Sequence, residues 1–235
     1  MPEKIITISG TSGAGKSFLT DKILHTFPGI TEIAGITTRS MRKGEIQGKS
    51  SHFITLEQFN TLERQNQLIL IKEFFGNRYA WFKSDLINDE KVKIMNISYK
   101  SIRELKQNGI ELFSIFVKPG SEEQLRERLE KRKMPQAEYE KRIQDYYESE
   151  EFLSQSQNLF NYIFVNNYDE KSTYEFLSNF ADQFILNKTL DDQSLERSIA
   201  QLLQMNNDID HKIIDAESII REQQRRQIKD GKIDE

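Results

Sequence analysis

The sequence contains no cysteine and only three histidines, which lie far apart. Disulfides, thiolate nucleophiles and cysteine metal sites are therefore excluded, and a histidine zinc site is not expected. A chain without cysteine fits a reducing compartment. A cytoplasmic location is the default expectation.

Long apolar runs and an excess of basic charge are also missing. No run approaches the roughly 20 apolar residues that cross a bilayer, and the first residues lead directly into a motif. We therefore expect neither a signal peptide nor a membrane segment. The formal net charge is −4, so no general affinity for nucleic acid is expected. A chain of 235 residues is long enough for one domain and an extension.

The chain does contain short apolar runs that alternate with helix-like segments. The first run, residues 4–9, leads through a glycine-rich loop into a helix predicted for residues 16–25. Further strands are predicted at residues 68–74, 92–97, 111–117 and 162–165. This alternation predicts an α/β fold with a central parallel sheet.

Several local signals fill in this outline. Thr55, Ser121, and Ser172 with Glu175 are typical of helix N-caps. Residues 36–53 look irregular or strand-rich, and a glycine and an asparagine at positions 76 and 77 predict a tight turn. These features predict a small lobe inserted into the sheet.

The composition changes after about residue 186, where the aromatic residues of the body disappear. We predict one domain at residues 1–186 and a helical extension at residues 187–235 that ends in a charged tail. Apolar residues then recur at spacings of four and three, a pattern typical of a coiled coil and hence of a homodimer. The alternative is an amphipathic helix that folds back onto its own domain. The repeating residues are Leu195, Ile199, Leu202, Asn206, Ile209, Ile213, Ala216 and Ile220.

The glycine-rich loop carries the strongest chemical signal. Residues 10–17 read G-T-S-G-A-G-K-S and match the phosphate-binding pattern G-x-x-x-x-G-K-S, between a strand and a helix as the chemistry requires. Backbone N–H groups and the helix N-terminus would surround phosphate oxygens of ATP. Lys16 would reach the β- and γ-phosphates, and Ser17 would hold Mg²⁺. The predicted nucleotide-binding residues are Gly10, Ser12, Gly13, Ala14, Gly15, Lys16 and Ser17.

A second segment reads T-T-R-S-M-R-K-G-E at residues 37–45, and a G-N-R-Y turn follows at residues 76–79. Together with the phosphate-binding loop, these motifs resemble the guanylate kinase family over about residues 4–184. The resemblance implies a P-loop kinase fold with a core, an acceptor-binding lobe and a lid. It also implies that Arg39, Arg42 and Tyr79 hold the phosphate of a small phosphorylated acceptor. Forked guanidinium donors suit this task.

The family resemblance extends to the lid. Arg128 and Arg132 fall in an L-x-x-R-L-x-x-R segment, and a second helix carries Arg142. The resemblance implies that these arginines close over the triphosphate, with catalytic roles for Lys16, Arg42, Arg132 and Arg142, and that Asn167 lies beside the adenine. The other interpretation of each arginine is a solvated charge on a helix face.

The chain departs from the family where the resemblance would place groups that read guanine. Those positions hold Gly35, Leu70, Trp81 and Ser98, while the phosphate-binding arginines remain. We therefore predict ATP- and Mg²⁺-dependent phosphoryl transfer to a nucleoside monophosphate, either GMP or dGMP or another acceptor. The alternatives are a kinase of a phosphorylated sugar and a nucleotide-binding interaction module with weak catalysis.

Overall fold

A computed structural model describes residues 4–42, 44–74, 76–86 and 91–185. The chain divides into two compact units, Met1–Tyr168 and Asp169–Glu235, and each is described by itself. The predicted seam between Leu195 and Ile220 lies outside the described residues. Among the residues described, no helix combines the length and apolar character needed to cross a membrane.

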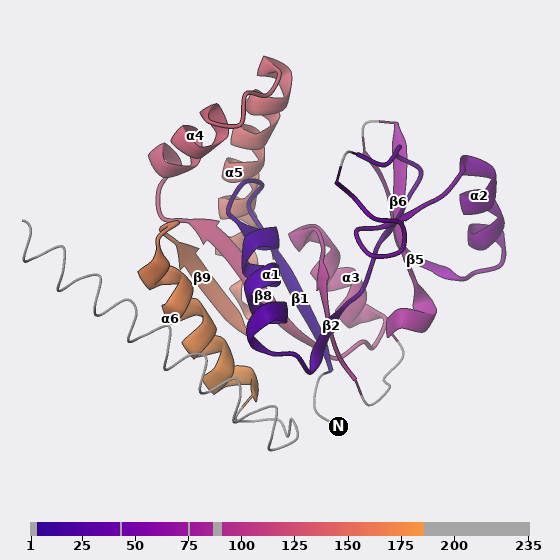
Figure 1. The fold of residues 1–235 in the computed structure, drawn as a ribbon, viewed down its shortest axis with the longest axis horizontal. Coiled ribbons are helices and arrows are strands. Elements are labelled where there is room, and N and C mark those ends of the chain that lie inside the picture. The colour runs from indigo at the N-terminus through magenta and orange to yellow at the C-terminus, as the bar shows by residue number, and fades with distance from the viewer. Residues whose placement is uncertain (1–3, 43, 75, 87–90, 186–235) are drawn as a thin grey trace, which may run out of the picture. The chain divides into compact units, whose positions relative to one another are not determined.

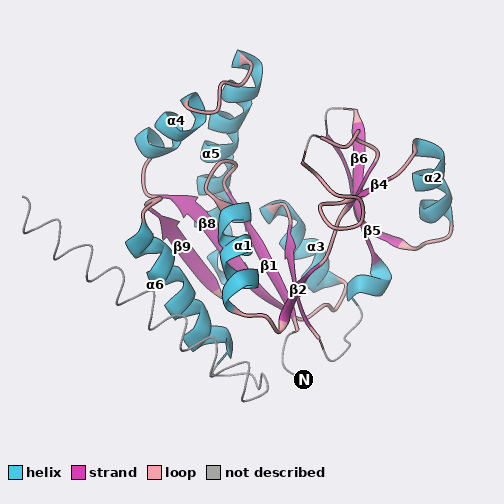
Figure 2. Ribbon diagram, viewed as in Figure 1, coloured by secondary structure: helices cyan, strands magenta, loops and turns pink. Residues whose placement is uncertain are grey.

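A five-stranded parallel sheet forms the core of the first unit, with strand order β2-β7-β1-β8-β9 (Figures 1 and 2). Its central strand, β1, leads directly into the glycine-rich loop. The sheet confirms the predicted α/β class. Its strands are β1 (Ile5–Gly10), β2 (Ile30–Glu32), β7 (Val92–Asn96), β8 (Leu112–Pro119) and β9 (Tyr162–Asn166).

Helices pack against this sheet through apolar side chains. Helix α1 (Lys16–Thr26) contacts β1, β2 and β7 (Figure 1). A buried cluster joins Met95 and Phe116 of the sheet to Ile102 of α3 (Ile102–Gln107) and Leu153 of α5 (Gln136–Ser156). The 3₁₀ turn Tyr99–Ser101 precedes α3. Burial of such side chains from water is the main force that holds these layers together.

The inserted lobe is a second, four-stranded sheet with strand order β4-β3-β6-β5, and α2 joins β4 to β5. Arg78 of β6 fixes α2, since it pairs with Glu63 at 2.7 Å and stacks on Phe59 with its guanidinium carbon 4.4 Å from the ring centre. Thr55 caps α2, as predicted, and forms a complete capping box with Gln58. The lobe's elements are β3 (Ile36–Thr37), β4 (His52–Phe53), α2 (Leu56–Arg64), β5 (Leu68–Phe74) and β6 (Asn77–Phe82).

Two helices form the lid region, α4 (Glu122–Glu130) and α5. Leu125 and Leu129 of α4 pack on Ile143 of α5 in a cluster of their own. Ser121 accepts a hydrogen bond from the backbone of Gln124 and caps α4, which confirms the predicted cap.

The described part of the second unit consists of α6 (Glu170–Phe180) and a π-helical turn at Ala181–Ile185. The prediction that Ser172 caps this helix is wrong. Asp169 is the N-cap and its side chain accepts from the backbone N–H of Ser172. An aspartate three residues earlier therefore takes the role expected of the serine, since both residue types cap helices well.

Gly10 allows a close backbone approach in the core. Its φ is +122°, and a β-carbon there would lie 2.1 Å from the carbonyl oxygen of Val117. We expect Gly10→Ala to lower the free energy of unfolding by about 3 kcal/mol or more, because strain and a backbone clash add together. Gly109→Ala is the matched control, since Gly109 also has a positive φ but has open space around it. Urea unfolding that gives equal losses for both variants would contradict this account.

Candidate active site

The glycine-rich loop is held by hydrogen bonds from β9 as well as by its own backbone. Gly13 and Gly15 have φ angles of +90° and +97°, which glycine adopts without strain. The side-chain amide of Asn166 donates to the carbonyl of Ala14 at 2.8 Å. A β-carbon at Gly15 would lie 2.6 Å from that amide nitrogen. The loop is therefore fixed in shape before any ligand arrives.

Lys16, the first residue of α1, folds back over this loop. Its Nζ donates to the carbonyl oxygens of Gly10 at 2.9 Å and Thr11 at 2.8 Å. Burial lowers the pKa of Lys16 to about 8, although Asp145 attracts the charged form. Arg142 and Arg132 lower this pKa further through repulsion. The site is thus rich in positive charge that an anionic ligand would relieve.

Helix α5 attaches the lid to the loop through Ser12. Arg142 donates from Nη1 to the hydroxyl of Ser12 at 2.7 Å, and the backbone N–H of Ser12 donates to Oδ2 of Asp145 at 2.7 Å. These two side chains lie three residues apart and so share one helix face. A further buried hydrogen bond joins the hydroxyls of Thr11 and Ser149 at 2.7 Å. Three hydrogen bonds therefore join α5 to the loop.

Two arginines of the lid segment lie close to the same loop. Arg128 stacks on Tyr168 with 4.6 Å between the guanidinium carbon and the ring centre, and its Nε is buried without a hydrogen-bond partner among the described residues. The hydroxyl of Tyr168 donates to the carbonyl of Gly13 at 3.4 Å. Partial burial lowers the pKa of Arg132, as does repulsion by Arg128 and Arg142. Like charges held together in this way favour a polyanion.

Arg39 of the lobe is held in a fixed orientation. Its two terminal nitrogens donate to both carboxylate oxygens of Glu45, at 2.8 and 2.9 Å, and its guanidinium lies over Phe53. The backbone N–H of Arg42 donates to the same carboxylate at 2.6 Å. The hydrogen bonds from Arg39 and from Arg42 lower the pKa of Glu45 to about 2. Arg39 also interacts with Tyr79.

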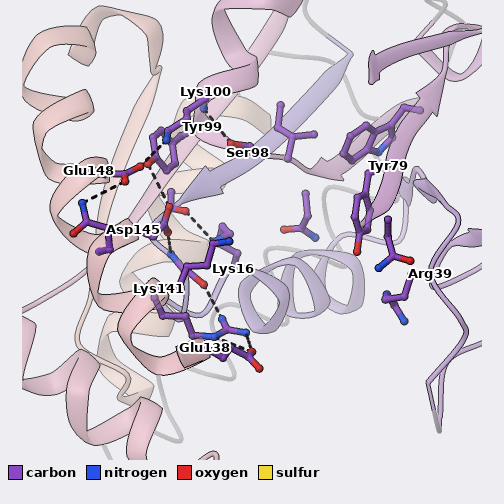
Figure 3. A pocket seen from close by; sticks show the side chains of 18 of the residues that line it. Lys16, Arg39, Tyr79, Ser98, Tyr99, Lys100, Glu138, Lys141, Asp145 and Glu148 are labelled. Carbon is purple, nitrogen blue, oxygen red and sulfur yellow. Dashed lines mark hydrogen bonds and ion pairs between the residues drawn. The ribbon is translucent and has the colours of Figure 1, made fainter. Parts of the chain in front are cut away.

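One cavity of about 860 Å³ unites the loop, the lobe and the lid. Lys16, Arg142, Arg39, Arg42 and Tyr79 all line it. Figure 3 shows Arg39 and Tyr79 on the opposite side of this cavity from Lys16, Asp145 and Glu138. Two cationic groups that face each other across one cavity could bind two phosphorylated molecules end to end.

Six of the predicted nucleotide-binding and catalytic residues do not line this cavity, namely Gly13, Ala14, Gly15, Ser17, Arg132 and Asn167. The first three belong to the loop itself. Ser17 is exposed in the first turn of α1, and Arg132 is exposed after α4. Asn167 is exposed after the end of β9, and its amide oxygen lies beside Gly120. Their proposed contacts with Mg²⁺, the triphosphate and adenine remain predictions.

Sequence reasoning missed Asp145, Asn166 and Tyr99. Asp145 could have been found from its spacing, because it follows Arg142 by three residues on a predicted helix. Asn166 is buried while Asn167 is exposed, and the exact end of the strand decided which amide meets the loop. Tyr99 lies in a 3₁₀ turn and donates to Asp145 at 3.3 Å. Burial, with repulsion from Asp145, raises its pKa and keeps its proton in place.

The described residues contain no group of three or more histidine, cysteine, aspartate or glutamate side chains that could hold a metal ion. This is compatible with Mg²⁺, which commonly keeps several waters and binds mainly through substrate phosphates. Ser17 in the first turn of α1 and Asn96 at the end of β7 carry neutral oxygens that could ligate such an ion. The side-chain oxygen of Asn96 accepts from Thr20 of α1 at 3.1 Å.

The low pKa of Lys16 predicts a pH dependence of triphosphate binding. Below a pH of about 8, Lys16 is already charged in the free protein. Above this pH, Lys16 must take up a proton when ATP binds. We expect affinity for ATP to fall as pH rises through this value, by at most about tenfold per pH unit. Titrations from about pH 7 to about pH 10 measure it. Lys16→Arg, which stays charged, should give a flat profile, and a flat wild-type profile would contradict the assignment.

Comparison with known proteins places this geometry in a family. The family model described as guanylate kinase matches residues 2–183. The guanylate kinase of Desulfitobacterium hafniense (strain Y51) is 32% identical over 166 residues, which covers 69% of this chain and 81% of that protein. The guanylate kinase of Trichodesmium erythraeum (strain IMS101) is 33% identical over 129 residues, which covers 54% and 69% respectively. The guanylate kinase of Trichormus variabilis (strain ATCC 29413 / PCC 7937) is 32% identical over 129 residues, which covers 54% of this chain and 65% of that protein.

A solved structure supports the same fold. The crystal structure of guanylate kinase from Anaplasma phagocytophilum superposes with a TM-score of 0.56 at 22% identity, covering 78% of this chain and 87% of that chain. The family model spans the strands, the lobe and the lid helices described above. The chain therefore belongs to the guanylate kinase family.

Proposed function

We propose that this protein transfers the γ-phosphoryl group of ATP to the phosphate of a nucleoside monophosphate. The observation that carries the proposal is the single cavity that holds Lys16 of the phosphate-binding loop opposite Arg39 and Tyr79 of the lobe. The relatives named above are guanylate kinases, which supports GMP or dGMP as candidate acceptors. Gly35, Leu70 and Trp81 stand where the family resemblance would place groups that read guanine. Other acceptors therefore remain candidates.

In the proposed reaction the chain binds, orients and neutralises. An oxygen of the acceptor's phosphate forms a bond to the γ-phosphorus, the bond from that phosphorus to the bridging oxygen breaks, and ADP leaves with the electron pair. Lys16 and Arg142 lie where negative charge spreads over the transferring group, while Arg39, Arg42 and Tyr79 hold the acceptor. Such preorganised donors supply most of the rate enhancement in this chemistry.

The loop residues fit a nucleotide with its metal ion. The backbone from Gly13 to Ser17 and the start of α1 would hold the triphosphate, and Ser17 would hold Mg²⁺. When bound, Mg²⁺ neutralises phosphate charge and aligns the oxygens. Closure of α5, which already contacts Ser12 through Arg142 and Asp145, would exclude water and so limit hydrolysis of ATP.

An assay of ADP formation tests the proposal. The protein is incubated with ATP and Mg²⁺ together with GMP, dGMP, AMP, UMP or ribose 5-phosphate, and again without an acceptor. We expect ADP to form only when an acceptor is present, and chelation of Mg²⁺ should stop the reaction. ADP formation that is equal with and without acceptor would indicate an ATPase, and none with any acceptor would rule out a kinase of these compounds.

A further inference from the structure

Strand β6 places an aromatic ring beside the phosphate-binding end of the lobe. Side chains two residues apart on a strand share a face and lie about 7 Å apart, so Tyr79 and Trp81 point the same way. Both line the cavity. Tyr79 interacts with Arg39. A phosphate held there would leave an attached ribose and base to extend along the strand towards Trp81.

A distortion of the neighbouring strand supports the indole. The β5–β6 pairing shifts register between Ile69 and Lys72, and Leu70 in this bulge has a φ of +55°. Leucine rarely adopts that conformation, and bulges commonly redirect a side chain near a site. Leu70 is only 1% exposed and belongs to the apolar cluster that includes Ile97, against which Trp81 packs. The bulge thus places an apolar side chain in the cluster against which Trp81 packs.

The indole lies next to the backbone of Gly35. A β-carbon at Gly35 would lie 3.4 Å from Cε2 of Trp81 and 3.5 Å from Nε1. No side chain therefore separates this backbone from the indole. Trp81 itself is only partly buried. It is a ring held by its surroundings and still accessible at the cavity.

The carboxylates that line the cavity are poorly suited to read a base. All three belong to α5, and each already has a partner. Glu138 pairs with Arg142 at 2.7 Å and Glu148 with Lys100 at 2.7 Å. Asp145 accepts from the backbone of Ser12 at 2.7 Å. None of the carboxylates that line the cavity belongs to the lobe. The lobe therefore offers the base of an acceptor the indole of Trp81, and not a carboxylate that would select one pattern of base donors.

From this arrangement we propose that Trp81 is the specificity-determining residue of the acceptor side. The base of a nucleoside monophosphate stacks on its indole while Arg39 and Tyr79 bind the phosphate. Stacking tolerates different bases because each has a π-face. The substrate class is accordingly nucleoside monophosphates with weak selection between bases, and sugar phosphates without a base are poor ligands. This inference rests on the proposed function for the assignment of the phosphate to Arg39.

The chain contains a single tryptophan, so its fluorescence reports on this ring without any need for turnover. With the donor site saturated by ADP, we expect GMP, AMP and UMP each to change the emission, with dissociation constants within about tenfold of one another. Ribose 5-phosphate should bind roughly 5- to 150-fold more weakly, the factor that corresponds to the loss of one base–aromatic stack. An emission change with one base alone, or equal binding of ribose 5-phosphate, would overturn the proposal.

Substitutions separate stacking from a general effect on folding. Calorimetry should show that Trp81→Ala weakens all three nucleoside monophosphates by roughly 5- to 150-fold and leaves ADP affinity unchanged, while Trp81→Phe recovers part of the loss. Phe82→Leu is the control, because it alters an aromatic side chain on the opposite face of the same strand. Unchanged affinity in Trp81→Ala refutes the stacking role even if phosphoryl transfer occurs. Emission changes without turnover would instead refute the proposed function and leave the stacking role intact.

Discussion

Replacing Lys16 by alanine is expected to lower kcat/KM for phosphoryl transfer by about 10³-fold, because removal of one preorganised charge at a reacting centre has effects of this size. Lys16 belongs to the glycine-rich loop and donates to two of its carbonyl oxygens, those of Gly10 and Thr11. ATP affinity should fall in the same variant. Steady-state kinetics and a direct ATP titration measure the two effects.

Lys22→Ala is the matched control for this substitution. Lys22 lies on the same helix, with its Nζ 5.4 Å from the ring centre of Phe18. It does not line the cavity. Its kinetics should equal those of the wild type, and thermal melting should show that both variants fold. Wild-type kcat/KM in the Lys16→Ala variant would show that the loop plays no part in the mechanism through Lys16.

Replacing Arg39 by alanine is expected to raise the KM of the acceptor by about 10- to 100-fold while ATP affinity is unchanged. The range follows from the loss of hydrogen bonds to a charged group, each worth about 1.5–3 kcal/mol. Arg39 lines the cavity in a fixed orientation, since Glu45 binds both of its terminal nitrogens. Arg39→Lys should recover little, because an ammonium group cannot reproduce the planar fork.

Arg64→Ala is the control for the lobe. Arg64 lies in the last turn of α2, where its Nη2 donates to the hydroxyl of Thr61 at 3.3 Å. Removing Arg64 changes the charge of the lobe by the same amount as removing Arg39, but it should not alter the acceptor's KM. If Arg39→Ala instead weakened ATP and left the acceptor unaffected, the donor and acceptor sides would have to be exchanged.

The sequence predicted the architecture well where local signals and tertiary structure agree. The strand predicted at residues 68–74 matches β5, and the bounds of the other predicted strands differ from the observed ones by at most two residues. Strands β3 and β4 have only two residues each. Strand β2 has three, of which only Ile30 is buried. Such short strands depend on their neighbours for pairing, so no local periodicity reveals them.

The site was predictable where it depends on a motif and less so where it depends on packing. The loop and the arginines at positions 39, 42 and 142 follow from sequence patterns, and all of these arginines line one cavity with Lys16. Asp145 contacts the loop across 133 residues of sequence. The proximity of Gly35 to Trp81 likewise depends on how the lobe packs. The spacing from Arg142 indicates the helix face of Asp145, but neither contact partner can be read from the local sequence.

The most direct test of the account follows the fate of the γ-phosphoryl group by phosphorus NMR. ATP, Mg²⁺ and the acceptor that gives most ADP are incubated with the wild-type protein and with Lys16→Ala. For the wild type we predict that the γ-resonance disappears while a new nucleoside diphosphate and ADP appear in equal amounts. Lys16→Ala should show little change over the same time. Phosphate released into solution without a second diphosphate would contradict transfer between the two sides of the cavity.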